Sequence, residues 1–369
     1  MGDGRESGSR SRRWRVAALG VGLTALPAVC WEGPPAAMAA PPAGEVVTLI
    51  PEFPRATAGP FPFGAQELSV WRARLPRVEP VEITSTADGT KQAALFYDPG
   101  REARRPLLVV LHSWSESYLQ NIGIPYGIFA ERNGWVLIAP DHRGPYHRPE
   151  ATASELAQQD VLDAIGYAKR RARVDPARIY LVGYSGSAMT SLVIAAKHPE
   201  MFGGVVAWVP IHDLVAWYSY LEKHASGSHY ARDVAASCGG PPVHGSRAAE
   251  ECRRRSPSAH LANARGRVNV LLGAGIWDHL VPPDHALRAF NDLAAPADRI
   301  GEDDLVRLVR TRRIPAHLAG SSASPLFKQA GVEGLLARTS ERATVVLFQG
   351  GHDLVYNAGL AWLADKRRD

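Results

Sequence analysis

The chain has 369 residues, of which 46% are hydrophobic and 21% are charged. This composition is typical of a globular protein and excludes an intrinsically disordered chain, and the length suits one large α/β domain or two small ones. The formal net charge is +5 and falls to +3 once the arginine-rich first 39 residues are set aside. So small an excess of positive charge predicts no nucleic-acid partner.

The first 39 residues have the pattern of a secretory signal peptide, with cleavage expected after Ala39. Arginines precede an apolar run over residues 16–29, and small residues follow at 37–39. The apolar run is too short for a membrane span, which takes about 20 residues. The stretch SRRWRV at residues 11–16 also fits a twin-arginine signal. Cys30 is an alternative lipid-anchor site, but the residues before it fit that processing poorly. The sequence therefore predicts a secreted or extracytoplasmic protein without a membrane span.

Removal of this leader leaves two cysteines, Cys238 and Cys252. In an exported chain such a pair is expected to form a disulfide, and the alternative is two buried free thiols. The segment between them, GGPPVHGSRAAEE, has the composition of a loop. The sequence contains neither a CxxC pair nor an HExxH motif, so we expect no metal site and no cofactor.

Residues 40–80 are rich in proline and are predicted to form an extended arm. From residue 81 onward, strand and helix patterns alternate, beginning with two strands joined by an Asp88-Gly89 turn. Further strands are expected at 106–112, 134–140, 178–184, 203–210, 268–275 and 343–350, and helices at 127–133, 154–173, 186–198, 284–293 and up to 366. This alternation predicts an α/β fold with a doubly wound, mostly parallel sheet and an N-terminal antiparallel hairpin.

The turn between the strand at 178–184 and the following helix reads Gly183-Tyr184-Ser185-Gly186-Ser187. A G-x-S-x-G turn in a strand-turn-helix setting exposes a serine nucleophile at the carboxyl ends of the strands. Ser187 stands where the last glycine of the motif is usual, and serine meets the need for a small residue almost as well. We therefore predict that Ser185 is a nucleophile.

A nucleophilic serine needs a base and an orienting acid, and in this type of fold the three follow in the order Ser, Asp or Glu, His. The strand at 268–275 leads into Asp278, which is the leading acid, and the strand at 343–350 leads into His352, which is the leading base. The rival candidates, which we take as structural or surface residues, are Asp284 and Asp353 for the acid, and His279 and His285 for the base.

Negative charge that develops on the substrate oxygen needs hydrogen-bond donors. The backbone N–H of Gly186, directly after the nucleophile, is the first candidate. The second is the N–H of Trp114, in the loop His112-Ser113-Trp114 after the strand at 106–112. Ser113 replaces a glycine that is usual in such loops.

Aromatic residues are frequent in the segment AWVPIHDLVAWYSY, residues 207–220. Trp208, Trp217 and Tyr218 are candidates for substrate binding, together with Tyr220. Such side chains would suit a flat acyl group, an aromatic ester or a sugar ring, and the alternative is that they pack in the core or in a lid.

From about residue 81 to its end, the chain resembles the catalytic domain of the prolyl oligopeptidase family within the α/β-hydrolases. The resemblance rests on DPARI before the Ser185 turn, on DHLVPPDHALRAFNDL, and on Gly-Gly-His at 350–352. It implies an α/β-hydrolase fold with Ser185, Asp278 and His352 as nucleophile, acid and base. The 74 residues between acid and base are many for the family, which suggests an insertion near residues 295–342.

The sequence thus predicts a secreted serine hydrolase that cleaves carboxylic esters through an acyl-enzyme on Ser185. Its partners would be small-molecule, glycan or peptide substrates with an ester or amide bond. A prolyl oligopeptidase-like peptidase, an acyltransferase and a non-catalytic binding protein on a hydrolase fold are the alternatives. The family's peptidases select short peptides with a β-propeller, and the 41 residues at 40–80 leave no room for one before the hydrolase pattern.

Overall fold

The computed structural model describes Met1 and residues 46–57, 65–100, 102–225, 227–318 and 324–369. Apart from Met1, the predicted signal peptide, its twin-arginine stretch and Cys30 lie outside these residues. All elements named below belong to one compact unit, Gly44–Asp369. No helix in the described part of the chain combines the length and the apolar character that crossing a membrane requires.

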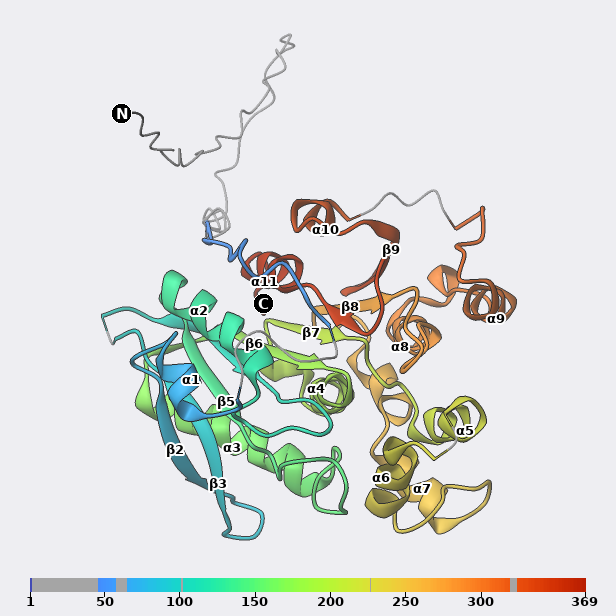
Figure 1. Cartoon of the computed structure of the whole chain (residues 1–369), viewed down its shortest axis with the longest axis horizontal. Coiled ribbons are helices and arrows are strands. Elements are labelled where there is room, and N and C mark those ends of the chain that lie inside the picture. Colours follow the sequence, from blue (N-terminus) through green and yellow to red (C-terminus); the bar gives the residue numbers. More distant parts are fainter. Residues whose placement is uncertain (2–45, 58–64, 101, 226, 319–323) are drawn as a thin grey trace, which may run out of the picture. The chain divides into compact units, whose positions relative to one another are not determined.

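A nine-stranded sheet forms the centre of this unit (Figure 1). Its strands, from one edge to the other, are β2 (Glu79–Thr84), β3 (Lys91–Tyr97), β5 (Val136–Pro140), β4 (Arg105–Val110), β6 (Val174–Tyr184), β7 (Gly204–Trp208), β8 (Val270–Gly275), β10 (Ala343–Phe348) and β9 (Gly334–Ser340).

The sheet is mostly parallel and is antiparallel only at its edges. Strands β5, β4, β6, β7, β8 and β10 pair in parallel, whereas β2 and β3 pair antiparallel as a hairpin, and β3 pairs antiparallel with β5. The predicted doubly wound, mostly parallel sheet with an N-terminal hairpin is thereby confirmed. The sequence reading lacked β9, which pairs antiparallel with β10 at the other edge.

Helices cover both faces of the sheet (Figure 1). Helix α2 (Ile124–Asn133) and helix α11 (Tyr356–Ala364) lie on one face, and α3 (Glu155–Arg171), α4 (Gly186–Lys197) and α8 (Asp284–Leu293) lie on the other. Two local signals fix the ends of α2 and α3. The Ser154 hydroxyl accepts from the N–H of Ala157 at the start of α3, and Gly134 ends α2 in the left-handed conformation.

Three helices gather beside the sheet and form what we call the cap: α5 (Leu214–His224), α6 (His229–Cys238) and α7 (Arg247–Arg254) (Figure 1). They enclose a second hydrophobic cluster, separate from the main core around the sheet. The loop expected between the cysteines is corrected here, because its last part, from Arg247 onward, belongs to α7. Its Ser246 hydroxyl caps the helix, and Ala248, Ala249 and Cys252 are buried along one side.

The predicted insertion near 295–342 contains α9 (Glu302–Thr311), α10 (Pro325–Gln329) and the edge strand β9. Leu305 and Leu308 of α9 are buried, as is Phe327 of α10, and all three belong to the main core. Its described parts are therefore continuous with the sheet domain.

The arm predicted at 40–80 is not extended throughout, since Leu68–Arg72 forms helix α1. The helix forms because Trp71 is fully buried, with its indole N–H donating to the Leu119 carbonyl. Upstream, β1 (Ala56–Thr57) pairs antiparallel with β11 (Asp353–Leu354). The arm therefore lies directly against the segment that follows His352.

Candidate active site

Ser185 lies in a strained turn between β6 and α4. Its φ of 58° and ψ of −120° are unusual for a non-glycine residue and are typical of a nucleophile turn. A Cβ placed on Gly183 would lie 2.3 Å from the Ser187 carbonyl oxygen, so only glycine fits there. The Ser185 backbone N–H donates to the Trp208 carbonyl, at 2.9 Å.

The Ser187 hydroxyl makes hydrogen bonds that glycine could not. It accepts from the Tyr184 N–H at 2.9 Å, and it lies 3.0 and 3.2 Å from the carbonyl oxygens of Tyr184 and Leu111. Ser187 is fully buried. The Ser187 side chain therefore links two parts of the turn, and it also links the turn to Leu111 at the end of the neighbouring strand.

The three residues predicted as nucleophile, base and acid are brought together in one hydrogen-bonded chain. His352 Nε2 lies 2.9 Å from Ser185 Oγ, and His352 Nδ1 lies 2.7 Å from Asp278 Oδ2. Only 9% of the His352 side chain is exposed, and Asp278 is fully buried. The geometry is that of a serine with a general base and an orienting carboxylate.

The loop that carries Asp278, residues 276–281, is held by bonds to its backbone. Asp278 Oδ1 accepts from the N–H groups of Leu280 and Val281, at 2.8 and 2.9 Å. The Arg312 guanidinium donates to the Ile276 carbonyl at 3.1 Å. Asp278 Oδ1 is therefore engaged by the backbone, which leaves Oδ2 directed at the imidazole.

The loop that carries His352 is also braced. The Tyr184 hydroxyl donates to the His352 carbonyl at 2.6 Å. Burial, and next the negative charge of Asp278, raise the pKa of Tyr184, so its hydroxyl remains a donor. The carboxylate of Asp353 accepts from the Gly351 N–H and lies 3.6 Å from the Arg55 guanidinium. Asp353, the rival candidate for the acid, thus stabilises the loop that carries His352.

The two residues that carry the candidate oxyanion donors are in contact through the Trp114 side chain. A Cβ placed on Gly186 would lie 2.8 Å from Cε3 of Trp114, so the indole packs directly on the start of α4. Within the described residues, neither the Trp114 nor the Gly186 backbone N–H donates to a protein acceptor. Their role as oxyanion donors stays a prediction.

Ser113, the second serine in place of a glycine, is clamped by Gln120. The Ser113 N–H donates to Gln120 Oε1 and the Gln120 amide donates to Ser113 Oγ, both at 2.8 Å. The sequence reading missed Gln120. In the sequence, Gln120 is simply a polar residue seven positions after Ser113, and this spacing does not predict the contact.

The remaining rivals are engaged elsewhere. Asp284 pairs with Arg288 at 3.2 Å, and the His279 ring faces Arg312 on the protein surface. His285 is buried, and its Nδ1 accepts from the His212 N–H at 3.1 Å. Burial lowers the pKa of His285 to about 4, which keeps the ring neutral.

The predicted aromatic binding residues have different surroundings. Trp208 is fully buried in the main core against Phe327 and Phe348, and its ring fills the space beside Gly273. Its assignment to substrate binding is therefore corrected. Trp217 is 1% exposed and belongs to the cap cluster, which places it in packing rather than in an open cleft. Tyr218 is partly exposed on α5, and its role stays a prediction.

A disulfide joins Cys238 at the end of α6 to Cys252 in α7, the pair expected from the sequence. Cα atoms of the two residues are 5.4 Å apart, within the usual range for a bridge. The bridge therefore fastens two helices of the cap to each other.

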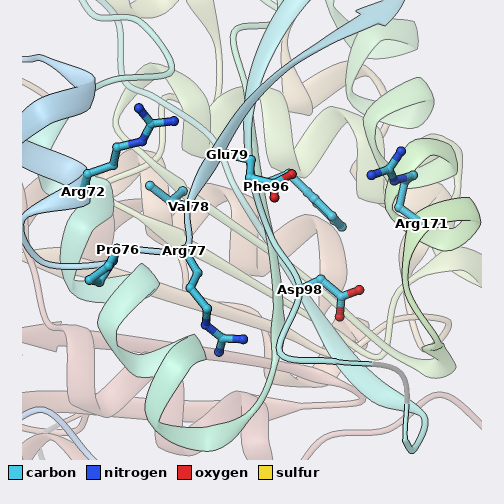
Figure 2. A pocket seen from close by; sticks show the side chains of 8 residues that line it. All are labelled: Arg72, Pro76, Arg77, Val78, Glu79, Phe96, Asp98 and Arg171. Carbon is cyan, nitrogen blue, oxygen red and sulfur yellow. The ribbon is translucent and has the colours of Figure 1, made fainter.

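A pocket of about 630 Å³ lies far from Ser185, at the amino end of the parallel strands. It is lined by Arg72, Pro76, Arg77, Val78, Glu79, Phe96, Asp98 and Arg171. Figure 2 shows Arg72 and Arg171 on opposite sides, with guanidinium groups that do not converge. The lining is mixed in charge and contains none of the predicted site residues. In the described residues we also find no group of three or more His, Cys, Asp or Glu side chains that could hold a metal ion.

Comparison with known proteins gives partial matches. Residues 131–311 match the prolyl oligopeptidase family, Peptidase S9. Acetylxylan esterase A of Aspergillus oryzae is 25% identical over 158 residues, 38% of this chain and 49% of that protein. Acetylxylan esterase A of Emericella nidulans is 23% identical over 145 residues, 35% of this chain and 46% of that protein. The chain thus spans about half the length of these curated relatives.

Solved structures with a similar fold include Pyrococcus horikoshii acylaminoacyl peptidase, with a TM-score of 0.44, 17% identity, and coverage of 61% of this chain and 36% of that one. A Mycobacterium tuberculosis puromycin-hydrolyzing peptidase gives a TM-score of 0.48, 19% identity, and coverage of 64% and 38%.

The family match over residues 131–311 falls within the sheet domain, whose strand order is that of a mostly parallel sheet. The predicted fold class and the resemblance stated from the sequence are both confirmed. Residues 131–311 match the prolyl oligopeptidase family, and the sheet around them has the architecture of an α/β-hydrolase fold.

Proposed function

We propose that this protein is an exported serine hydrolase that cleaves carboxylic esters through an acyl-enzyme on Ser185. The observation that carries the proposal is the hydrogen-bonded chain from Ser185 Oγ through His352 to Asp278. Ser185, Asp278 and His352 follow three different strands, and the stability of the fold does not require their side chains to lie within hydrogen-bond distance. The arrangement supports nucleophilic catalysis by the serine.

In the proposed reaction, Ser185 Oγ attacks the ester carbonyl carbon while His352 Nε2 takes its proton. The carbonyl oxygen becomes negative and accepts from the N–H groups of Gly186 and Trp114. The tetrahedral intermediate collapses with cleavage of the C–O bond, and His352 gives its proton to the departing alcohol. His352 then takes a proton from water as the water oxygen attacks the acyl-enzyme, and it gives this proton to Ser185 Oγ when the bond to the acyl group breaks and the acid is released. Asp278 stays ionised and holds the imidazole in orientation.

Acetyl esters of carbohydrates are the substrates we propose first. The support is the similarity to two proteins named acetylxylan esterase A. The indole of Trp114 and the ring of Tyr146 crowd the start of α4, since a Cβ on Gly186 would lie 2.8 and 3.2 Å from them.

Export is proposed from the leader pattern of residues 1–39 together with the disulfide. Disulfides persist in oxidising compartments and are rare in the cytosol. The bridge between Cys238 and Cys252 therefore supports a location outside the cytoplasm.

The family's name favours peptide bonds, so the deciding experiment compares esters with amides. We would measure kcat/KM of one preparation on aryl acetates, acetylated xylo-oligosaccharides and aminoacyl or dipeptidyl amides, with Ser185→Ala as the blank. We expect esters to exceed amides by at least about 10-fold, because an amide nitrogen is the poorer leaving group and needs protonation in register. A tenfold preference for amides would replace the esterase proposal with a peptidase.

A further inference from the structure

Two aromatic side chains of the cap reach the loop that carries Asp278. Trp217 and Tyr220 are three residues apart on α5 and so lie on one side of the helix. The Trp217 indole N–H donates to the Leu280 carbonyl and the Tyr220 hydroxyl donates to the His279 carbonyl, both at 2.8 Å. We call this pair the α5 clamp.

Each bond of the α5 clamp ends on a peptide group that itself contacts Asp278. The Leu280 carbonyl shares its peptide plane with the Val281 N–H, and the His279 carbonyl shares its plane with the Leu280 N–H. Those two N–H groups are the donors to Asp278 Oδ1. Because a peptide unit is planar, fixing its oxygen fixes the direction of its N–H.

Trp217 also contacts the loop that carries the second oxyanion donor. Its ring packs against that of Trp114, with centroids 5.0 Å apart. The Trp114 indole N–H in turn donates to Asp233 of α6 at 3.1 Å. One buried cap residue thus touches both the acid loop and the oxyanion loop.

We propose that Trp217 and Tyr220 are positioning residues that orient Asp278 through the two peptide groups, so that the cap controls the alignment of His352. They act through Asp278, and nothing in the role requires them to touch the substrate. The proposal rests on the proposed function, since it assigns the α5 clamp to the same serine hydrolase site.

The test uses variants that keep an aromatic side chain and remove one donor: Tyr220→Phe, which keeps the same ring, and Trp217→Phe, which replaces the indole by a smaller ring. We expect kcat on an aryl acetate to fall about 10-fold for each, with KM within about twofold, because alignment in the transition state is lost and substrate binding is not. The matched control is Tyr180→Phe, which also removes a hydrogen bond from a phenol to a backbone carbonyl, that of Lys366, far from the site. Its kcat should equal that of the wild type, even if its melting temperature falls as much as those of Trp217→Phe and Tyr220→Phe.

The decisive step repeats both substitutions in an Asp278→Asn background. If the clamp acts through Asp278, each substitution should then change kcat by less than about twofold, because residues that act as a unit are not additive. Persistence of the full 10-fold loss, or wild-type kcat in both single variants, would overturn the proposal. Absence of ester hydrolysis in the wild type, or full activity in Ser185→Ala, would instead overturn the proposed function.

Discussion

The sheet domain and the cap contribute to the candidate site in different ways. The sheet places Ser185, Asp278 and His352 within a few residues of the ends of β6, β8 and β10. The cap contributes none of these three residues. Its side chains do form hydrogen bonds to the loop that carries Asp278 and to Trp114 of the predicted oxyanion loop. The predicted reacting groups therefore belong to the sheet domain, whereas the proposed α5 clamp makes their alignment depend on the smaller core of the cap.

The largest expected effect tests the sheet side. Ser185→Ala should lower kcat/KM for esters by about 10⁴-fold or more, as is usual for the serine of a triad. The fold should remain, because alanine is small, although the φ of 58° is no more favourable for it than for serine. Ester kinetics, circular dichroism and labelling by a fluorophosphonate check the result. Retention of most activity would remove Ser185 as the nucleophile.

The second prediction concerns the cap alone. A non-reduced digest should contain the peptides of Cys238 and Cys252 joined to each other. Replacing both by serine should lower the free energy of unfolding by about 3 kcal/mol, because the unfolded chain loses a cross-link. Thermal and denaturant unfolding would measure this loss in the free energy of unfolding. Free thiols at both positions in exported protein would contradict the prediction.

The third prediction compares two buried serines of α4. Ser187→Ala leaves the Tyr184 N–H without its acceptor, which should cost about 1–3 kcal/mol of stability and about 10-fold in kcat. Ser191→Ala is the matched control, since the Ser191 hydroxyl donates only to the Ala188 carbonyl within the same helix. Equal kcat in the two variants would mean that the Ser187 hydroxyl does not support the turn.

The fourth prediction applies only at acid pH and concerns the junction of sheet and cap, where His285 of α8 accepts from the His212 N–H just before α5. Burial lowers the pKa of His285 to about 4, from 6.5. The stability that depends on its neutral ring is full above pH 6.5 and is lost as the pH falls toward 4, at about 1.4 kcal/mol per pH unit.

His285→Asn keeps an acceptor and removes the titration. Its free energy of unfolding should therefore fall less than that of the wild type between pH 6.5 and 4, as denaturant titrations at several pH values would measure. Parallel pH curves for the two proteins would exclude His285 as a source of acid sensitivity.

The sequence alone determined the fold class, a mostly parallel α/β sheet with an N-terminal hairpin, and it named the candidate nucleophile, base and acid. Apolar runs such as that of β8 mark buried strands, and helix α8 begins and ends at the predicted residues. Ser185, Asp278 and His352 each follow such a strand closely. Because carboxyl ends of parallel strands meet at one edge, chain position was enough to bring these residues together.

Only the tertiary structure decided how these residues are held. Trp217 and Leu280 are 63 residues apart, and Trp114 and Asp233 are 119 apart. Trp208, predicted to bind substrate, is buried against Phe327 and Phe348 in the main core instead. Local patterns follow the period of one helix or strand, whereas these contacts depend on which distant surfaces pack together. That packing, and not any motif, places the α5 clamp on the acid loop.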